Sequence, residues 1–396
     1  MRAIDRWLGV PVCFALTALE RLLRRRSDSP PRNALAILLP EAGSLALAHP
    51  AIRHLRSLFP GIRVRFLVFR RNRHFLERLG IVAPEDIWTL DDGSAWAFLR
   101  SSLGFFRRAW REGIDTTLDF DMFARASMIL AYLSGARRRA GFDNYRAEGL
   151  YRGRLLTHPA PYNVYRPIAL NYAALAQALA LDPAEQPAVK QALRIDLSLP
   201  KEDFPAERIA AARERIREAY PALEPRTRIV ALSPFSGNLL PIRAWPAEHY
   251  AEFLRGLFAA REDVVAVAIG LPEARGFCRP MFERAASPRL VDFIGRTKDI
   301  GEAIDLLGAS DALVTSDGGP AHFASLTRTP TIVLFGPETP ALYAPLGANV
   351  RCVYLGLHCS PCVSAFNHRD TPCKNNECMK QIKPEDVLRL TLQALE

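Results

Sequence analysis

The sequence lacks a hydrophobic run long enough to cross a bilayer, which needs roughly 20 apolar residues. Its most apolar stretch, from Trp7 to Leu23, is interrupted by Glu20 and is followed by Arg24 to Arg26. No small-residue cleavage site follows, so a secretory signal peptide is not expected. Apolar and aromatic residues beside a basic cluster predict an amphipathic helix within residues 1–30 that lies in the headgroup layer of an anionic membrane. A helix packed on the protein's own surface is the alternative.

Short repeats and low-complexity tracts are also missing, and no aromatic-rich nucleic-acid-binding signature accompanies the arginine clusters. The 396 residues carry a formal net charge of +10, which favours an anionic partner such as a nucleotide diphosphate, a phosphorylated lipid or a membrane surface. Nucleic acid is not expected as a partner. The apolar share of 49% and charged share of 24% are typical of a soluble globular protein. The length suits two domains.

Strand and helix patterns alternate along the chain, which predicts α/β domains built on parallel sheets. A first series begins with a strand at Ala34–Leu39, and a second begins at Ile229–Leu232. Residues 163–222 are Ala-rich and helical in pattern, with prolines at 205, 221 and 225 that indicate an interdomain connection. The sequence therefore predicts two doubly wound, Rossmann-like domains that face each other across a cleft, at residues 31–224 and 225–396. A linker is expected at Ser27–Asn33, and a hinge near 222–228.

The segment from Asp311 to Pro340 carries the clearest local signal. Its pattern is a strand at Ala312–Thr315, a Gly-rich turn, a short helix and a second strand at Thr331–Phe335. A turn of this kind at the end of a parallel strand directs bare backbone N–H groups at an anion, most often a phosphate. His322 lies on the first turn of the helix, near the same mouth. The segment therefore predicts a phosphate-binding site.

Four of the seven cysteines lie within twenty residues near the C-terminus, in two pairs: Cys359 with Cys362, and Cys373 with Cys378. Close thiol pairs are typical of structural zinc sites. Disulfides need an oxidising compartment, and no export signal is recognised. The pattern favours a structural zinc clip, with disulfides as the alternative.

Two parts of the 311–340 segment resemble the nucleotide-sugar site of the family 9 glycosyltransferases, the heptosyltransferases of lipopolysaccharide core synthesis and their relatives. They are DGGPAH, from Asp317 to His322, and FGP, from Phe335 to Pro337, with Pro340 after it. The family's pattern is close to D-[ST]-G-x-x-H with a later F-G-P-T-x-P. Gly318 departs from this pattern, which removes one hydroxyl contact to phosphate but leaves the backbone donors. The resemblance implies that Asp317, Gly318, Gly319 and His322 bind the nucleotide diphosphate.

Three further residues of the second domain match the family in order. Arg243 stands before Trp245-Pro246, where the family has the basic residue of a K-x-W-P element. A cation beside a diphosphate stabilises charge on the leaving group, and Arg can do so with two hydrogen bonds. A surface arginine before a helix-starting proline is the alternative. The resemblance implies that Glu273 accepts hydrogen bonds from ribose hydroxyls and that Thr297 lies near the nucleotide.

The first domain departs from the family at the expected base. Gly43-Ser44 stands where the family has a Gly-Asp pair, whose Asp is held to activate the acceptor hydroxyl. A serine hydroxyl is too weak to act as a general base near pH 7. Glu41, in the same loop, is the candidate substitute. A base elsewhere, a phosphate-assisted reaction and a diverged activity are the alternatives.

Asp119 and Asp121 have the Asp-x-Asp spacing of metal-dependent glycosyltransferases. Their context is instead similar to the family's D-x5-R stretch, which has no metal. The resemblance therefore places Asp119, Arg125 and Ser44 on the acceptor side.

The resemblance implies the two-domain GT-B fold and an inverting, metal-independent transfer of a sugar, with ADP-heptose favoured as donor. The acceptor would be a lipid-linked glycan of lipopolysaccharide-core or other cell-envelope type, reached from the cytoplasm by a protein bound peripherally to the inner face of the cytoplasmic membrane. The second domain would hold the donor and the first the acceptor. The alternatives are a catalytically impaired nucleotide-sugar or glycan-binding protein, and a nucleotide-sugar epimerase.

Overall fold

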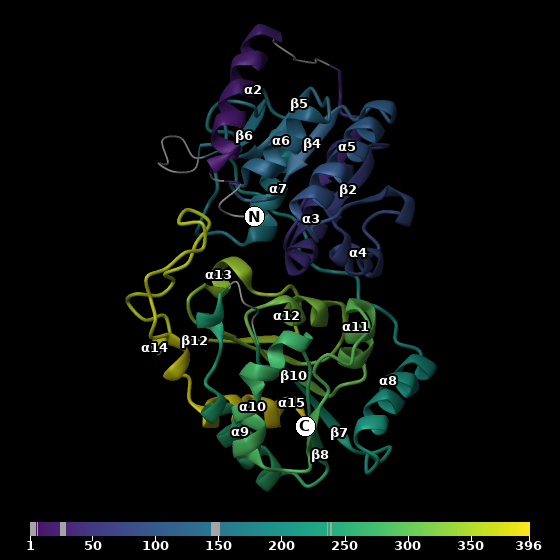
Figure 1. Cartoon of the computed structure of the whole chain (residues 1–396), viewed down its shortest axis with the longest axis vertical. Helices are drawn as coiled ribbons and strands as arrows, with labels where there is room; N and C mark the ends of the chain where they lie inside the picture. The colour runs from purple at the N-terminus through teal and green to yellow at the C-terminus, as the bar shows by residue number, and fades with distance from the viewer. Residues whose placement is uncertain (1–4, 6, 24–28, 144–150, 236, 238–239) are drawn as a thin grey trace. The chain divides into compact units, whose positions relative to one another are not determined.

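The computed structural model describes residues 5, 7–23, 29–143, 151–235, 237 and 240–396. It divides into two compact units, Met1–Leu197 and Ser198–Glu396. Each unit contains a six-stranded, wholly parallel sheet with helices packed against it (Figure 1). Strands buried on both faces explain the continuous apolar runs in the sequence. The predicted α/β class and the two Rossmann-like domains are confirmed.

The sheet of unit 1 has the strand order β3-β2-β1-β4-β5-β6. Its strands are β1 (Asn33–Ile37), β2 (Arg63–Phe69), β3 (Ile87–Leu90), β4 (Thr116–Asp119), β5 (Arg138–Phe142) and β6 (His158–Ala160). Its helices are α2 (Gly9–Leu23), α3 (Ala42–Leu58), α4 (Arg73–Leu79), α5 (Ala95–Arg111), α6 (Arg125–Leu133) and α7 (Ile168–Ala178). Leu35 and Ile37 of β1 pack into one core cluster with residues of α2, α5 and α6, so these three helices cover the same face of the sheet.

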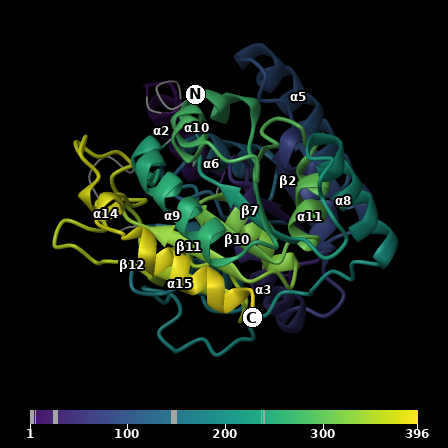
Figure 2. The ribbon, with the colours of Figure 1, turned by 90° about the horizontal axis from the view of Figure 1, so that it is seen from below.

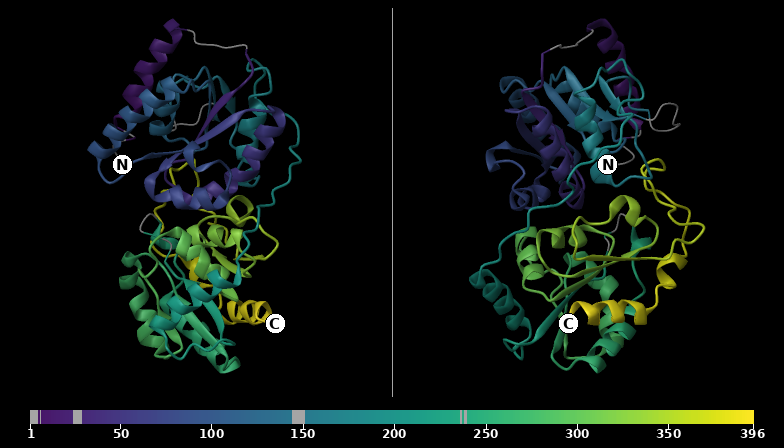
Figure 3. Two further views of the ribbon diagram at one scale, coloured as in Figure 1. Left: turned by 90° about the vertical axis from the view of Figure 1, so that its right-hand side faces the viewer. Right: turned by 180° about the vertical axis from the view of Figure 1, so that it is seen from behind.

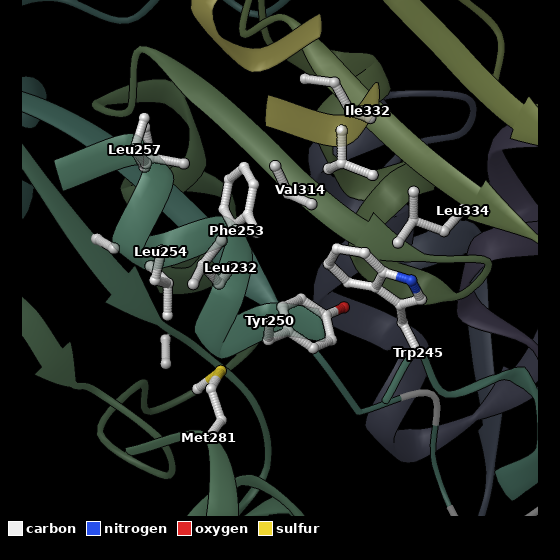
Figure 4. Packing of buried hydrophobic residues seen from close by; sticks show 14 of the residues in the cluster. Leu232, Trp245, Tyr250, Phe253, Leu254, Leu257, Met281, Val314, Ile332 and Leu334 are labelled. Atoms are coloured by element: carbon white, nitrogen blue, oxygen red, sulfur yellow. The ribbon is translucent and has the colours of Figure 1, made fainter. Parts of the chain in front are cut away.

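The sheet of unit 2 has the order β12-β11-β10-β7-β8-β9 (Figure 2). Its strands are β7 (Arg228–Ser233), β8 (Val264–Ala268), β9 (Leu290–Asp292), β10 (Ala312–Ser316), β11 (Thr331–Phe335) and β12 (Val350–Tyr354). Its helices are α8 (Ala206–Ala219), α9 (Ala247–Ala260), α10 (Arg275–Ala285), α11 (Ile300–Gly308), α12 (Gly319–Phe323), α13 (Pro340–Tyr343), α14 (Glu377–Lys380) and α15 (Pro384–Ala394). Trp245 and Phe253 pack with Val314 and Leu334 in the core of this unit (Figure 4).

Helix α8 belongs to unit 2, so the units divide before it, earlier than the connection expected near 222–228. The physical reason is its packing on α11. Arg215 Nε lies 3.0 Å from Glu302 Oε1, and Arg208 pairs with Asp305. The proline-rich stretch after α8 therefore lies inside unit 2 and leads into β7.

Helix α2 packs on unit 1 through one side, which is the alternative that the sequence left open. Cys13 is fully buried in the core of the unit. Glu20 Oε1 lies 2.7 Å from Arg139 Nη2, and the Thr17 hydroxyl accepts a hydrogen bond from the Arg154 backbone N–H. Arg24 to Arg26 lie outside the described residues. No helix among the described residues is both long and apolar enough to cross a membrane.

Both sheets have a point where the strand order reverses. The reversal lies between β1 and β4 in unit 1, and between β7 and β10 in unit 2. In open parallel sheets, ligands bind outside the carboxyl ends of the strands at this point. The loops after these four strands are therefore where candidate site residues are sought.

Candidate functional site

In unit 2, the reversal point brings together a buried acid and an arginine. Asp317 follows β10, and its backbone N–H donates to Leu334 O of β11 at 3.0 Å. Arg243 comes from the loop after β7, and its Nη1 donates to Asp317 Oδ2 at 3.4 Å. Asp317 is buried, and the Arg243 side chain is only 13% exposed. The structure thus joins two predicted site residues that lie 74 positions apart in the sequence.

Arg243 is held on both sides by the backbone around it. It ends a short 3-10 helix, Pro241–Arg243. The indole of Trp245 is fully buried and donates to Ile382 O at 3.0 Å. The Asn376 side-chain amide donates to Ile242 O at 2.9 Å and to Ala244 O at 3.0 Å. Because the backbone on either side is fixed, the guanidinium is largely preorganised, as electrostatic stabilisation of a leaving group requires.

Glu338 and Arg369 join the same cluster, and the sequence analysis missed both. Glu338 follows β11 and is 3% exposed, and its Oε1 lies 3.6 Å from Arg369 Nε. Arg369 Nη2 donates to the Tyr343 hydroxyl at 3.1 Å. One sequence signal for Glu338 was available. The family pattern F-G-P-T-x-P has Thr at this position, and this chain has an acidic residue there instead.

The cysteine-containing loop delivers Arg369 to this cluster. The backbone N–H groups of Cys362 and Val363 donate to Pro337 O at 3.0 and 3.1 Å. The Ser360 hydroxyl donates to Gly336 O. The loop therefore packs along the turn that follows β11, which carries Glu338.

Several buried polar atoms at this edge have no hydrogen-bond partner within the described chain. They are Ser316 Oγ, His322 Nδ1 and Glu338 Oε1. Desolvation of such groups is costly unless a ligand or water satisfies them. Gly318 and Gly319 precede His322 in the same turn, so their backbone N–H groups add donors. The arrangement fits a polar, anionic ligand.

Burial shifts the pKa values of the ionisable groups in this cluster. Burial, and secondarily Arg243, lowers the pKa of His322 to about 4, so its imidazole is neutral near pH 7. Burial, and secondarily the nearby Asp317, raises the pKa of Glu338 to about 8. Burial also raises the pKa of Asp317, while Arg243 opposes that shift. With Glu338 protonated, two guanidinium groups face one carboxylate, which leaves a net positive site for an anion.

Glu273 and Thr297 lie on loops at the same edge of the sheet, after β8 and β9. The two loops pack together, because Gly295 N donates to Gly270 O at 2.8 Å. Glu273 is exposed and Thr297 half-buried. In the part of the chain that the structure describes, neither makes a hydrogen bond to the Asp317 cluster. Their role toward a nucleotide stays a prediction.

In unit 1, the loop after β1 places Glu41 beside Ser44. Glu41 stands immediately before α3, and Ser44 lies in its first turn. The Ser44 hydroxyl donates to Glu41 Oε2 at 2.8 Å, and Ser44 is 4% exposed. The serine that replaces the family's Asp thus hydrogen-bonds the carboxylate that was the candidate substitute.

The other predicted acceptor-side residues of unit 1 make internal pairs. Asp119 is fully buried, and its Oδ2 accepts a hydrogen bond from Arg152 Nη1 at 2.7 Å. Asp121 accepts the Leu39 backbone N–H at 3.1 Å, which ties the loop after β4 to the loop after β1. Arg125 is buried, with its Nε donating to Tyr151 O at 2.9 Å and its Nη1 3.3 Å from Asp5. These contacts hold the loops of unit 1 together, so Asp119 and Arg125 have a structural role. Their role toward an acceptor stays a prediction.

The predicted zinc clip is not supported. Within the described ranges, no three His, Cys, Asp or Glu side chains are grouped so that they could hold a metal ion. All seven cysteines are free thiols, with Cys359 exposed and Cys378 buried. The four thiols do lie near one another, because burial and then Cys362, Cys373 and Cys359 raise the pKa of Cys378 to about 11, but the thiols make contacts of their own. Thr371 donates to Cys362 Sγ at 3.5 Å, Cys373 Sγ donates to Asn375 O at 3.4 Å, and Cys378 packs beside Gly336.

The sequence model described as Glycosyltransferase family 9 (heptosyltransferase) matches residues 106–371. Two curated relatives are heptosyltransferases. The lipooligosaccharide heptosyltransferase 2 of Campylobacter jejuni serotype O:2 is 24% identical over 164 residues, 41% of this chain and 49% of that protein. The enzyme of the same name from Haemophilus ducreyi is 21% identical over 328 residues, 79% of this chain and 86% of its own length. The match to the first of these thus spans about half of its length.

A solved structure, that of the Escherichia coli ADP-heptose lipopolysaccharide heptosyltransferase II, is similar to this chain with a TM-score of 0.67 at 18% identity. The likeness covers 92% of this chain and 98% of that structure. It shows the fold, two Rossmann-like domains of the GT-B type. The predicted GT-B fold is confirmed.

Proposed function

We propose that this chain, which belongs to glycosyltransferase family 9 (heptosyltransferase), transfers a sugar from a nucleotide diphosphate donor to a lipid-linked glycan of the cell envelope. Heptose from ADP-heptose is the favoured donor, and a lipopolysaccharide-core glycan is the favoured acceptor. The observation that carries the proposal is the Arg243–Asp317 pair at the strand-order reversal of the second sheet, with His322 and the DGG turn beside it.

In the proposed reaction, an acceptor hydroxyl oxygen attacks the anomeric carbon of the donor sugar. The bond from that carbon to the phosphate oxygen breaks, and the nucleoside diphosphate leaves with the electron pair. Direct displacement inverts the configuration, as the family resemblance implies. Arg243 stabilises the charge on the leaving diphosphate, and the neutral His322 donates one ring N–H to it. Asp317 positions Arg243.

A base must take the proton of the acceptor hydroxyl, and we assign this role to Glu41. A carboxylate can take this proton, and the Ser44 hydroxyl orients it at 2.8 Å. Asp119 and Arg125 support the loops on which acceptor contacts are made. Glu273 and Thr297 are assigned to the ribose and the nucleotide. The structural zinc stays outside the proposal, because the thiols as placed offer no three-ligand group, and no step needs a metal ion.

The protein would work in the cytoplasm, peripherally bound to the inner face of the cytoplasmic membrane, where a lipid-linked acceptor is presented. This location is part of the proposal.

The test is an incubation of the purified full-length chain with a panel of nucleotide sugars, with and without an envelope-lipid extract, while free nucleoside diphosphate is measured. Acceptor-dependent release with one donor is the expected result. Binding without turnover would overturn transfer in favour of a glycan- or nucleotide-sugar-binding protein. Isomerised donor without release would instead indicate an epimerase.

A further inference from the structure

The exposed large hydrophobic side chains of this chain are concentrated on two helices. Eleven of the sixteen found among the described residues lie in residues 7–23, which end with α2, or on α5. Single exposed apolar residues are normal on a protein surface, but a concentration of this kind marks an interaction site. The concentration therefore indicates that another molecule or a membrane binds to this surface.

On α5, the exposed apolar residues share one side of the helix. Trp96, Leu99, Leu103 and Trp110 recur at helical spacing and are 72%, 52%, 51% and 61% exposed. The opposite side carries Phe105 and Ala109, which are buried in the core of unit 1. The helix thus already has an apolar side for its own core. Trp110 donates a hydrogen bond to Leu133 O, but the folding of unit 1 does not explain Trp96, Leu99 and Leu103 on the outer side.

Helix α2 repeats the pattern. Cys13 and Thr17 point into unit 1, while Leu19 and Leu22 are 42% and 82% exposed. Both α2 and α5 contact α6, and all three helices cover the same face of the sheet. The views of Figure 1 and Figure 3 show α2 and α5 in this layer. Their outer sides therefore belong to one surface, here called the α2/α5 face: Trp7, Leu8, Leu19 and Leu22 with Trp96, Leu99, Leu103 and Trp110.

The charges on this face are basic. Helix α5 has four arginines and no acidic residue. Arg100, Arg107 and Arg111 are exposed and make no ion pair within the described part of the chain. Arg21, near the end of α2, is exposed as well. A second copy of this face would repel the first, because both carry the same sign. Exposed tryptophans and leucines beside unpaired arginines match the headgroup layer of an anionic bilayer.

We propose that the α2/α5 face docks unit 1 flat on an anionic phospholipid bilayer, with Leu99 and Leu103 at the acyl boundary and Arg100, Arg107 and Arg111 on lipid phosphates. The inference deepens the proposed function, since it names the membrane-facing surface of a protein whose acceptor is lipid-linked. It extends the expected interfacial helix from residues 1–30 to a second helix, which the sequence analysis did not find.

The test uses the full-length protein and sedimentation with vesicles of phosphatidylcholine alone or mixed with phosphatidylglycerol. Deleting residues 1–30 is unsuitable, because Cys13 belongs to the core of unit 1. The variant is Leu99→Glu with Leu103→Glu, which leaves the Trp110 hydrogen bond to Leu133 O in place. The matched control is Leu271→Glu, at a 70% exposed leucine of unit 2.

Wild type and the control should bind the anionic vesicles alike, and the double variant at least about tenfold less, since two apolar side chains that would be buried in the bilayer become charged. Arg100→Gln with Arg107→Gln should weaken binding only to anionic vesicles, by about tenfold or more, since two contacts with lipid phosphates are lost. Equal binding of the leucine double variant and wild type, with matching circular dichroism and melting temperature, would overturn the proposal. So would a wild-type dimer in sedimentation velocity that this variant converts to a monomer, which would assign the face to a second copy.

Failure of this inference can be told apart from failure of the proposed function. Vesicle binding is measured without donor, and transfer is measured without vesicles, on a delipidated glycan acceptor. The leucine double variant should lose the first and keep the second. Loss of transfer to the delipidated acceptor in this variant would also count against a purely membrane-docking face.

Discussion

The two sheets share one plan, yet the buried acids at their carboxyl edges differ in their hydrogen bonds. In unit 1, Asp119 is bonded to Arg152 and Asp121 to the Leu39 backbone, while the buried Tyr172 hydroxyl has no hydrogen-bond partner in the described part of the chain. In unit 2, Ser316 Oγ, His322 Nδ1 and Glu338 Oε1 are buried without hydrogen-bond partners. A satisfied buried network stabilises loops, whereas unsatisfied buried groups carry a cost that a ligand can remove. The comparison supports the proposed anion site in unit 2, and the proposed chemistry of unit 1 depends on Glu41.

The largest expected effect tests that dependence. Glu41→Gln should lower kcat by about 10³-fold, because a general base of this kind contributes roughly 10²–10⁴-fold. Donor KM should change little, since Glu41 belongs to unit 1. The measurement is steady-state release of nucleoside diphosphate with acceptor present.

A companion variant sharpens the assignment. Ser44→Asp in the Glu41→Gln background should restore part of the rate, because it returns a carboxylate to the family's position beside the same loop. Ser44→Ala alone should lower kcat several-fold through loss of the 2.8 Å hydrogen bond. An unchanged rate in Glu41→Gln would remove Glu41 from the reaction and leave unit 1 without an assigned base.

The second effect lies in unit 2. Arg243→Ala should lower kcat by about 10²-fold, the loss typical of one preorganised donor to a developing negative charge. Arg243→Lys should recover part of it, since a point charge replaces a two-pronged donor. Arg279→Ala is the matched control, because this side chain lies in the same unit and is 78% exposed. It should leave kcat unchanged. Equal losses in Arg243→Ala and Arg279→Ala would contradict the assigned site.

The third effect is a pH dependence of donor KM, which we expect to arise in unit 2. Glu338 faces Asp317, Arg243 and Arg369, and its pKa is raised to about 8. Below that pH the Glu338 carboxyl is neutral and does not repel the donor diphosphate, whereas above it the carboxylate does. Donor KM should therefore rise severalfold as pH goes from 7 to 9 in the wild type. In Glu338→Gln, donor KM should not change between pH 7 and 9. A parallel rise in both proteins would assign the titration elsewhere.

The same shift has a consequence for stability. The folded chain holds the Glu338 proton more tightly than an ordinary carboxyl of pKa 4.5. Between about pH 4.5 and 8 the folded state thus binds more protons than the unfolded state, so this contribution is full below 4.5 and is lost as pH rises through 8. Denaturant melts should show wild type losing stability over this window relative to Glu338→Gln.

The sequence predicted the central strands well but missed strand β5 and helix α5 of unit 1. Strands β1, β7 and β10 are largely apolar in sequence, as buried parallel strands require. Strand β5 was missed because it begins with Arg138 and Arg139, and burial of Arg139 depends on Glu20, far away in sequence. Helix α5 was missed because its apolar residues lie on both sides.

The candidate site divides in the same way. The Gly-rich turn predicted a phosphate site near His322, and the family resemblance predicted that Asp317, His322 and Arg243 bind the diphosphate. Glu338 and Arg369 could not be paired from the sequence, since their contact depends on the path of the irregular loop that packs against Pro337. The sequence therefore predicted the members of the first charge pair, Arg243 and Asp317, whereas the pairing of Glu338 with Arg369 depends on tertiary contacts.

The smallest expected effect concerns Gly318, where this chain departs from the family's hydroxyl residue. Its φ of 176° is extended backbone that any residue adopts, and a Cβ would meet its nearest neighbour, Ser316 O, at 3.7 Å. Gly318→Ser should therefore fold normally and add one hydrogen bond to the diphosphate, worth about 1 kcal/mol, or about fivefold in donor KM. Gly319→Ser is the contrasting control, because a Cβ there meets the Phe323 ring at 3.1 Å and should lower the melting temperature. Weaker donor binding in a stably folded Gly318→Ser would mean that the diphosphate approaches this backbone too closely for a side chain, so that the glycine is a requirement of the unit 2 site rather than a tolerated loss.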